Sequence, residues 1–262
     1  MRGKKSGVAC GDRVEYRSTA NEQGVIEAIE PRTSKLYRSD AFKEKIIAAN
    51  VTQVIVVVAA IPSFSEELIN RCLVAAESEN IAVLIVLNKA DLVEPTRIAM
   101  DMLSCYQDLG CRVLALSALH DVSLLQPYLK KHLSVLAGQS GMGKSTLLNT
   151  LIPQAKRATA EISLALDSGC HTTTHSQLYR LDAESAIIDS PGFQEFGLNH
   201  IPQENLAWGF VEFQPYFGRC KFSNCRHINE PGCAVIEAAQ QGKIQPKRLA
   251  FYHRLFSSHQ CK

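Results

Sequence analysis

No apolar run in this sequence reaches the ~20 residues that a membrane-spanning helix needs. The first five residues also lack the apolar stretch of a secretory signal. The excess of one sign of charge is also small, because 28 Lys and Arg nearly balance 26 Asp and Glu and leave a net charge of +2. These shortages predict a soluble cytoplasmic protein with no membrane partner. Any contact with nucleic acid must then come from local basic clusters.

The sequence also lacks the cysteine pattern of a disulfide-bonded protein. The nine cysteines are odd in number and scattered along 262 residues, which argues against a disulfide framework and favours a metal cluster. With 46% hydrophobic residues the chain can bury a substantial core, and its length predicts one large unit or two to three smaller ones. Nothing in the sequence demands more than a monomer.

Nine residues in mid-chain have the GxxxxGKS pattern of a phosphate-binding loop. They are Gly138, Gln139, Ser140, Gly141, Met142, Gly143, Lys144, Ser145 and Thr146. An apolar run at 133–137 precedes them and a helix-like run at 147–151 follows, which is the strand–loop–helix context the motif requires. The pattern predicts that backbone N–H groups hold the phosphates, that Lys144 reaches the β and γ phosphates, and that Ser145 is a Mg²⁺ ligand. The alternative is a glycine-rich turn that happens to contain a lysine.

Apolar runs alternate with amphipathic stretches over residues 51–137. The runs at 54–60, 81–87, 113–116 and 133–137 are separated by candidate helices at 66–79, 95–109 and 123–132. This order predicts an α/β unit with a parallel sheet covered on both faces. Its ligand should then lie at the carboxyl ends of the strands.

The second of these runs ends in Asn88, Lys89, Ala90 and Asp91, an NKxD pattern typical of guanine-specific pockets. The Asp91 carboxylate can accept hydrogen bonds from guanine N1–H and N2–H₂, which adenine cannot supply in that arrangement. We expect Asn88 and the Lys89 stem to brace the loop and cover the base. The next run ends at Ser117 and Ala118, whose backbone N–H groups are candidates to meet guanine O6.

A DxxG turn follows another short apolar run, at 186–188. It predicts Asp189 near Mg²⁺ and the Gly192 N–H near the γ-phosphate. The preceding stretch 169–175 is rich in threonine, and Thr173 is our candidate Mg²⁺ ligand, with its neighbours or a simple polar strand edge as alternatives. Phe193 stands where many GTPases carry a water-orienting glutamine. His171 is therefore the candidate to orient the attacking water, unless it only holds the loop.

The motifs occur in an unusual order, because the guanine-reading Asn88 lies 50 residues before Gly138. In ordinary small GTPases the phosphate loop comes first. A circular permutation of the same sheet, with the old termini joined around 130–132, reconciles the two orders. The DxxG loop then leads directly into a C-terminal domain.

Four soft metal ligands gather within 14 residues near the C-terminus. They are Cys220, Cys225, His227 and Cys233. Three thiolates and one imidazole with no open position predict one structural tetrahedral zinc ion, whereas unliganded buried thiols are the alternative. The flanking stretches 206–213, 234–241 and 247–257 are helical in pattern, and basic residues among them offer a second RNA contact.

The first 48 residues form a different unit. Short β-like pieces are separated by turn residues, and basic residues such as Arg13, Arg17 and Arg38 are interleaved with Tyr16 and Tyr37. Such a surface is suited to RNA backbone and base stacking, although a merely solvated face would have the same composition.

Taken together, NKAD at 88–91, GQSGMGKST at 138–146, GCHTTT at 169–174, DSPG at 189–192 and the C-terminal cysteines resemble the circularly permuted, ribosome small-subunit-dependent GTPase A family. The resemblance implies three domains: an OB-fold barrel at 1–48, a permuted P-loop GTPase domain at 49–197, and a helical zinc-binding domain at 198–262. It also implies late maturation of the 30S subunit, with contact to its rRNA, ribosome-stimulated hydrolysis of GTP to GDP, and Mg²⁺ bound with GTP. The chain starts late compared with the family, so an incomplete or truncated barrel is expected.

Two other functions compete with this interpretation. A P-loop kinase of a small metabolite would need no guanine reader, so NKAD and DSPG count against it. A zinc-containing RNA-binding module with a vestigial nucleotide site would bind ribosomes without turning over GTP.

Overall fold

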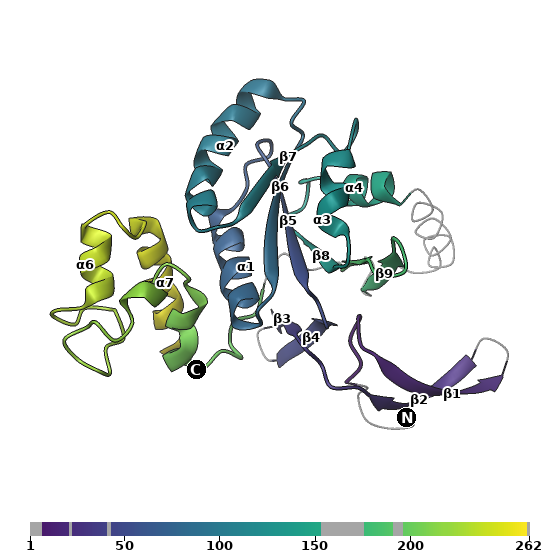
Figure 1. The fold of residues 1–262 in the computed structure, drawn as a ribbon, viewed down its shortest axis with the longest axis horizontal. Helices are drawn as coiled ribbons and strands as arrows, with labels where there is room; N and C mark the ends of the chain where they lie inside the picture. Colours follow the sequence, from purple (N-terminus) through teal and green to yellow (C-terminus); the bar gives the residue numbers. More distant parts are fainter. Residues whose placement is uncertain (1–6, 21–22, 41–42, 153–175, 191–195, 261–262) are drawn as a thin grey trace.

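A six-stranded sheet forms the centre of the molecule. The computed structural model describes residues 7–20, 23–40, 43–152, 176–190 and 196–260. The sheet contains β5 (Gln53–Ala59), β6 (Ala82–Asn88), β7 (Arg112–Ala115), β8 (Leu133–Ala137), β9 (Gln177–Arg180) and β10 (Ala186–Asp189). The strand order is β7-β6-β5-β8-β10-β9, and every neighbouring pair is parallel except β9 with β10 (Figure 1). The expected α/β architecture is confirmed, with β5, the first strand of the sheet in the sequence, at its middle.

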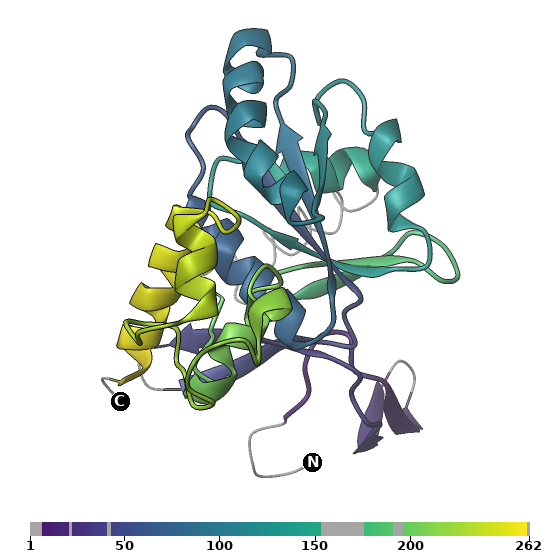
Figure 2. The ribbon, with the colours of Figure 1, turned by 60° about the vertical axis from the view of Figure 1, so that its left-hand side comes forward.

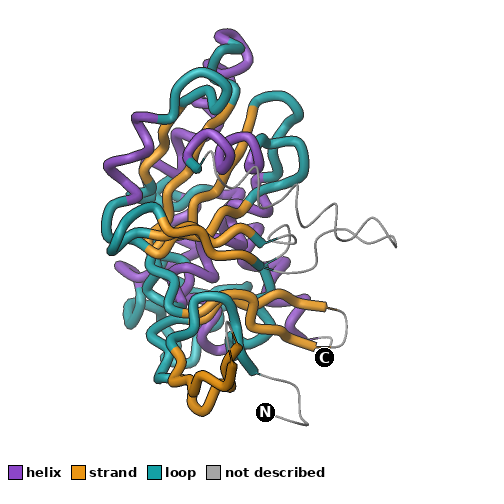
Figure 3. Tube along the Cα trace, turned by 90° about the vertical axis from the view of Figure 1, so that its right-hand side faces the viewer, coloured by secondary structure: helices purple, strands orange, loops and turns teal. Residues whose placement is uncertain are grey.

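Helices cover both faces of this sheet (Figures 1 and 3). On one face lie α1 (Glu66–Ser78), which packs on β5 and β6, and α2 (Val93–Asp108), which packs on β6 and β7; both share one hydrophobic core with Val54, Val56 and Val58 of β5. On the other lie α3 (Gln126–Leu129) and α4 (Lys144–Leu151), packed against the alternate residues Ile55 and Val57. Every residue of β5 is buried, as expected for a central parallel strand. None of the helices described here has the length and apolar content that a membrane crossing requires.

Two predicted helices have different bounds from those expected. The segment 123–132 forms only a 3₁₀ turn (Ser123–Leu125) and the four-residue α3, because Lys130 is extended and Lys131 adopts a φ of 62° before the chain enters β8. Helix α2 begins two residues before Pro95. Proline is tolerated there because the first-turn N–H groups have no partner within the helix.

The N-terminal strands form two separate hairpins. They are β1 (Val14–Ala20) with β2 (Gln23–Ile29), and β3 (Lys35–Asp40) with β4 (Lys43–Ala49), each pair antiparallel. In Figure 1 the β1–β2 hairpin projects away from the body of the molecule, and most residues of β2 are exposed. The second hairpin is anchored instead, since Leu36 and Ala48 join the core on the α1 side of the sheet. Among the described residues these strands form two separate two-stranded sheets, and the OB-fold barrel stays a prediction.

The C-terminal region packs on α1 (Figure 2). It contains two 3₁₀ segments, η2 (Gln203–Gly209) and η3 (Gln214–Tyr216), followed by α6 (Ala234–Gln240) and α7 (Pro246–Gln260). The predicted helix at 206–213 is therefore wrong in type and bounds. The close contact with α1 is made at Gly209, where a Cβ would lie 2.7 Å from the Val74 side chain, so only glycine fits.

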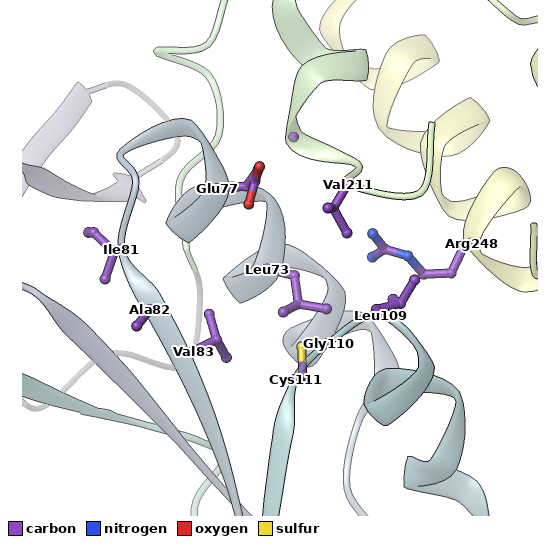
Figure 4. A pocket seen from close by; sticks show the side chains of 11 residues that line it. Leu73, Glu77, Ile81, Ala82, Val83, Leu109, Gly110, Cys111, Val211 and Arg248 are labelled. Carbon is purple, nitrogen blue, oxygen red and sulfur yellow. The ribbon is translucent and has the colours of Figure 1, made fainter. Parts of the chain in front are cut away.

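A buried arginine links the C-terminal region to the central domain. Arg248 of α7 is 4% exposed and donates from Nε to Glu212 at 2.6 Å, from Nη2 to the same carboxylate at 3.2 Å, and from Nη1 to Asn70 of α1 at 3.0 Å. Its guanidinium also lies over the Phe210 ring, 4.6 Å from the centroid. Figure 4 shows Arg248 pointing from α7 toward α1, beside a cavity of about 200 Å³.

Replacing Arg248 with methionine is expected to lower the free energy of unfolding by about 3 kcal/mol, because the Glu212 carboxylate then stays buried without a partner. Urea denaturation measures this change. Arg97→Met is the matched control, since Arg97 pairs with Glu94 at the surface and its loss should cost under about 1 kcal/mol. Equal losses in the two variants would contradict the role assigned to the buried pair.

Candidate functional site

The sequence motifs converge at one edge of the sheet. Asn88 is the last residue of β6, Gly138 follows β8, and Asp189 is the last residue of β10. These strands are parallel to β5, so their carboxyl ends lie on the same side of the sheet. Residues from both halves of the permuted order are thus brought to one place.

The phosphate-binding loop needs its first and last pattern glycines. Gly138 has a φ of 144°, and a Cβ there would lie 2.3 Å from the Val57 carbonyl oxygen of the neighbouring strand. Gly143 has a φ of 90° and caps the start of α4. The loop thus passes close to β5 and then turns directly into a helix, which aims the first N–H groups of α4 at the loop's interior.

Lys144 closes the loop in this structure. Its Nζ donates to the carbonyl oxygens of Gly138 at 2.6 Å and Gln139 at 2.7 Å. Burial lowers the pKa of Lys144 while the charge of Asp189 raises it, and burial raises the pKa of Asp189 while Lys144 lowers it. Burial outweighs their mutual attraction, so the pKa of Lys144 is lowered overall and that of Asp189 is raised. A cation and a carboxylate that are both partly desolvated suit a site that binds polyphosphate together with Mg²⁺.

Asn88 joins three loops of the site. Its Nδ2 donates to the Met142 carbonyl in the phosphate loop at 2.9 Å, and its Oδ1 accepts from the N–H groups of Lys89 at 2.8 Å and Ala118 at 2.9 Å. The side chain is buried, so each of these bonds is sheltered from water. Asn88 thereby fixes the position of the base-reading loops relative to the phosphate loop.

Asp91 presents a carboxylate acceptor at the surface. Its Oδ1 accepts from Ser117 Oγ at 2.6 Å, and this hydrogen bond holds the pKa of Asp91 below its usual value. The carboxylate is therefore ionised at neutral pH and able to accept from guanine. The Ala118 N–H already donates to Asn88, so its expected contact with guanine O6 requires that bond to be shared. Lys89 has a φ of 63°, and its Nζ donates to the Ile61 carbonyl at 2.8 Å.

The γ-phosphate side of the site is described only in part. His171, Thr173 and Gly192 lie outside the described residues, and their roles stay predictions. The two flanking serines are described: Ser176 and Ser190 share a hydroxyl–hydroxyl hydrogen bond of 2.6 Å, and Ser176 Oγ also lies 3.5 Å from the Ile47 carbonyl of β4. This pair extends the β9–β10 ladder one step beyond Asp189, which pairs with Gln177.

The chain that leaves the DxxG turn pairs with the second hairpin. Phe196 forms an antiparallel bridge with Arg38 of β3, and the Gly197 N–H donates to the Tyr37 carbonyl at 3.0 Å. The Tyr37 ring stacks on His200 with centroids 4.1 Å apart. Sequence reasoning missed these contacts and the Ser176–Ser190 pair, because no spacing rule links residues so far apart along the chain.

The four predicted metal ligands come together. The ligand atoms of Cys220, Cys225, His227 and Cys233 lie within 4.8 Å of one another, and His227 Nδ1 is 3.6, 3.6 and 3.3 Å from the three sulfurs in that order. Ligand atoms of a tetrahedral zinc site with Cys and His are about 3.5 Å apart, so the cluster fits one zinc ion.

Hydrogen bonds around the cluster hold its ligands in place. The Ala234 N–H donates to Cys220 Sγ at 3.4 Å, and His253 Nε2 lies 2.9 Å from the His227 carbonyl. The Tyr252 hydroxyl donates to the Arg226 carbonyl at 2.6 Å. Burial raises the pKa of Cys225 to about 12, so metal binding must displace protons from the thiols.

Known proteins share this arrangement. The family model described as RsgA GTPase matches residues 29–199. Proteins named small ribosomal subunit biogenesis GTPase RsgA are similar over almost the whole chain: that of Nitrosospira multiformis is 60% identical over 98% of this chain and 82% of its own length, and that of Nitrosomonas europaea 55% over 97% and 82%.

Two crystal structures have the same fold. YjeQ from Thermotoga maritima has a TM-score of 0.75 and 33% identity, covering 97% of this chain and 85% of its own. YloQ, a circularly permuted GTPase, has a TM-score of 0.73 and 28% identity, covering 99% and 83%. With the guanine-reading loop preceding the phosphate loop on one sheet edge, this chain belongs to the RsgA GTPase family and is a P-loop GTP hydrolase of permuted order.

Proposed function

We propose that this GTPase acts in biogenesis of the small ribosomal subunit, where it binds the 30S particle and its rRNA and hydrolyses GTP on it. The names of the relatives at 60% and 55% identity support this role. The observation that carries the nucleotide part is Asn88, whose three hydrogen bonds join the base-reading and phosphate loops. The proposal includes a cytoplasmic location and a monomeric state, and retains the three predicted domains.

The second hairpin offers a route by which RNA binding can act on hydrolysis. β3 pairs with the segment that leaves the DxxG turn, and β4 contacts Ser176 at the start of β9. A partner that moves or orders this hairpin thus acts on residues next to Asp189. In this scheme the isolated protein hydrolyses GTP slowly, and the ribosomal partner completes the site.

Each residue of the nucleotide site has a proposed task. Lys144 neutralises the β and γ phosphates, and Asp91 selects guanine. Ser145, Thr173 and Asp189 would hold Mg²⁺, which supplies charge neutralisation at the phosphates when bound. The Gly192 N–H approaches the γ-phosphate, and His171 orients the water.

Turnover of GTP and ATP, with and without purified 30S subunits, tests this function. We expect slow hydrolysis of GTP alone, stimulation by 30S, and no use of ATP. Equal use of ATP would favour a kinase-like enzyme. Binding to 30S without any turnover would favour a zinc-containing RNA-binding module with a vestigial nucleotide site.

His171→Ala is expected to lower 30S-stimulated turnover at least about tenfold and leave GTP affinity nearly unchanged, because the histidine orients water and does not bind nucleotide. Single-turnover hydrolysis and equilibrium binding measure the two quantities. His175→Ala, four residues further on in the same stretch, is the control. Wild-type stimulated rates in the first variant would remove His171 from the mechanism.

The cysteine cluster is proposed to hold one structural zinc ion. Purified protein is expected to contain one equivalent of zinc by metal analysis, and Cys233→Ala should lose it because one of four ligands is gone. Cys105→Ala removes a thiol outside the cluster and should keep the zinc. A full equivalent of zinc in the Cys233 variant would contradict the site.

A further inference from the structure

A groove of about 760 Å³ lies beside the cysteine cluster. Its walls come from η2, from the turn at 217–218, from the ligand loop at 220–227 and from α7. Three of the four proposed zinc ligands, Cys220, Cys225 and His227, also line it, so the groove includes one side of the proposed zinc site and extends from there to η2 and α7. Its size is that of pockets that hold small organic groups.

Two exposed aromatic rings line this groove. Trp208 is 58% exposed, and its ring is held edge-on against Phe217, with centroids 4.5 Å apart. Phe217 in turn stacks on the ligand His227 at 5.8 Å, so the indole rests on the rigid cluster. Phe222, in the ligand loop, is 42% exposed. Rings fixed by packing on one side and open on the other are platforms for flat ligands.

The charge of the groove favours an anion. Lys221 and Arg226 line it together with one carboxylate, Glu204, and Lys221 Nζ lies 5.6 Å from the Phe222 centroid. Trp208 also borders a second pocket, but that pocket contains Glu77 and Glu79. An anionic ligand that stacks on Trp208 is therefore drawn to the side of the cysteine cluster.

We propose that this groove binds single-stranded RNA, with unpaired bases stacked on Trp208 and Phe222 and the adjoining phosphates near Lys221 and Arg226. The proposal rests on the proposed function for its RNA partner and adds the surface and the strandedness that it recognises. Flat bases match the rings, and phosphates match the two cations. A duplex hides its bases in the stack and offers only phosphates.

The sequence provides a direct probe, because Trp208 is the chain's only tryptophan. The zinc-loaded full chain is titrated with a six-nucleotide single-stranded oligoribonucleotide while its tryptophan fluorescence is recorded. We expect saturable quenching that weakens as salt is raised, and little quenching by a duplex of the same length. Absence of quenching, or equal quenching by the duplex, would overturn the proposal. Quenching by 30S particles but not by the oligonucleotide would overturn it too, because the occupant would then not be recognised as single-stranded RNA.

Variants separate stacking from charge. Phe222→Ala should weaken binding of the oligonucleotide about tenfold, and Lys221→Gln should reduce the slope of log affinity against log salt by about one. Both should keep wild-type zinc content and basal GTP turnover. Val93→Ala, which changes an exposed apolar residue on α2, is the control and should bind as wild type.

The same variants distinguish this proposal from the proposed function. If wild-type protein is not stimulated by 30S, the proposed function fails, whatever the oligonucleotide does. If wild-type and Phe222→Ala proteins bind 30S and the oligonucleotide equally well, the groove proposal fails and the proposed function stands.

Discussion

Asp91→Asn is expected to lower GTP affinity at least about 100-fold and to raise affinity for xanthosine triphosphate. The Asp91 carboxylate only accepts hydrogen bonds, and its bond from Ser117 Oγ at 2.6 Å lowers its pKa further below neutral. An amide in its place directs donors at the N1–H and N2–H₂ donors of guanine, which leaves groups on both sides unpaired. Xanthine carries a carbonyl at that carbon and can accept from the amide. Equilibrium titration with GTP and with xanthosine triphosphate measures the two affinities.

A matched control lies in the turn that follows Ser117. Asp121 is also an exposed carboxylate that accepts from a serine hydroxyl, Ser123 Oγ, at 2.7 Å. Asp121→Asn changes the same chemical group outside the proposed base contact and should leave both affinities unchanged. Similar loss of GTP binding in the two variants, or none in the Asp91 variant, would show that Asp91 does not read the base.

Gly143→Ala should abolish measurable nucleotide binding and lower the free energy of unfolding by about 3 kcal/mol. A Cβ at this position would lie 2.2 Å from Asn88 Nδ2, so the amide that joins three loops must leave its place. This loss of stability has two parts. One is about 1–2 kcal/mol of backbone strain at a φ of 90°, and the other is the cost of buried groups left without hydrogen bonds. Thermal denaturation and GTP titration measure the two effects.

Gly110→Ala isolates the strain from the clash. Gly110 has a φ of 85°, but a Cβ there would meet nothing within 4 Å. This variant should lose about 1–2 kcal/mol of stability and bind GTP normally. If both alanine variants bind GTP alike, the contact between Gly143 and Asn88 does not organise the site.

The loops of the site are the part of the structure that the sequence predicts best. A backbone that curls around phosphate needs glycine where φ is positive, as at Gly138 and Gly143, so chemistry restricts the residues and leaves a readable pattern. The four metal ligands are readable for the same reason. The buried strand β5 follows from its unbroken apolar run.

Other features leave no such pattern. Arg248 reaches Glu212 and Asn70, which lie 36 and 178 residues away, and nothing in the local sequence marks them as partners. The end of α3 depends on a positive φ at Lys131, a residue type that gives no warning of it. The arrangement of the N-terminal hairpins is another example, because the described strands form two separate two-stranded sheets and no residue of β2 is buried. Such outcomes depend on tertiary packing and not on local preference.

The contact between Asn70 and Arg248 can form only after most of this chain has been synthesised, so the packing of α1 is completed late during translation. α1 leaves the ribosome tunnel long before its partner Arg248 on α7, which follows Asn70 by 178 residues. Until then, the side of α1 that carries Val74 has nothing to pack against. A nascent chain stalled before residue 248 therefore exposes apolar surface that promotes aggregation with other nascent chains. Chaperone dependence of the nascent chain should therefore persist until α7 has emerged and packed on α1.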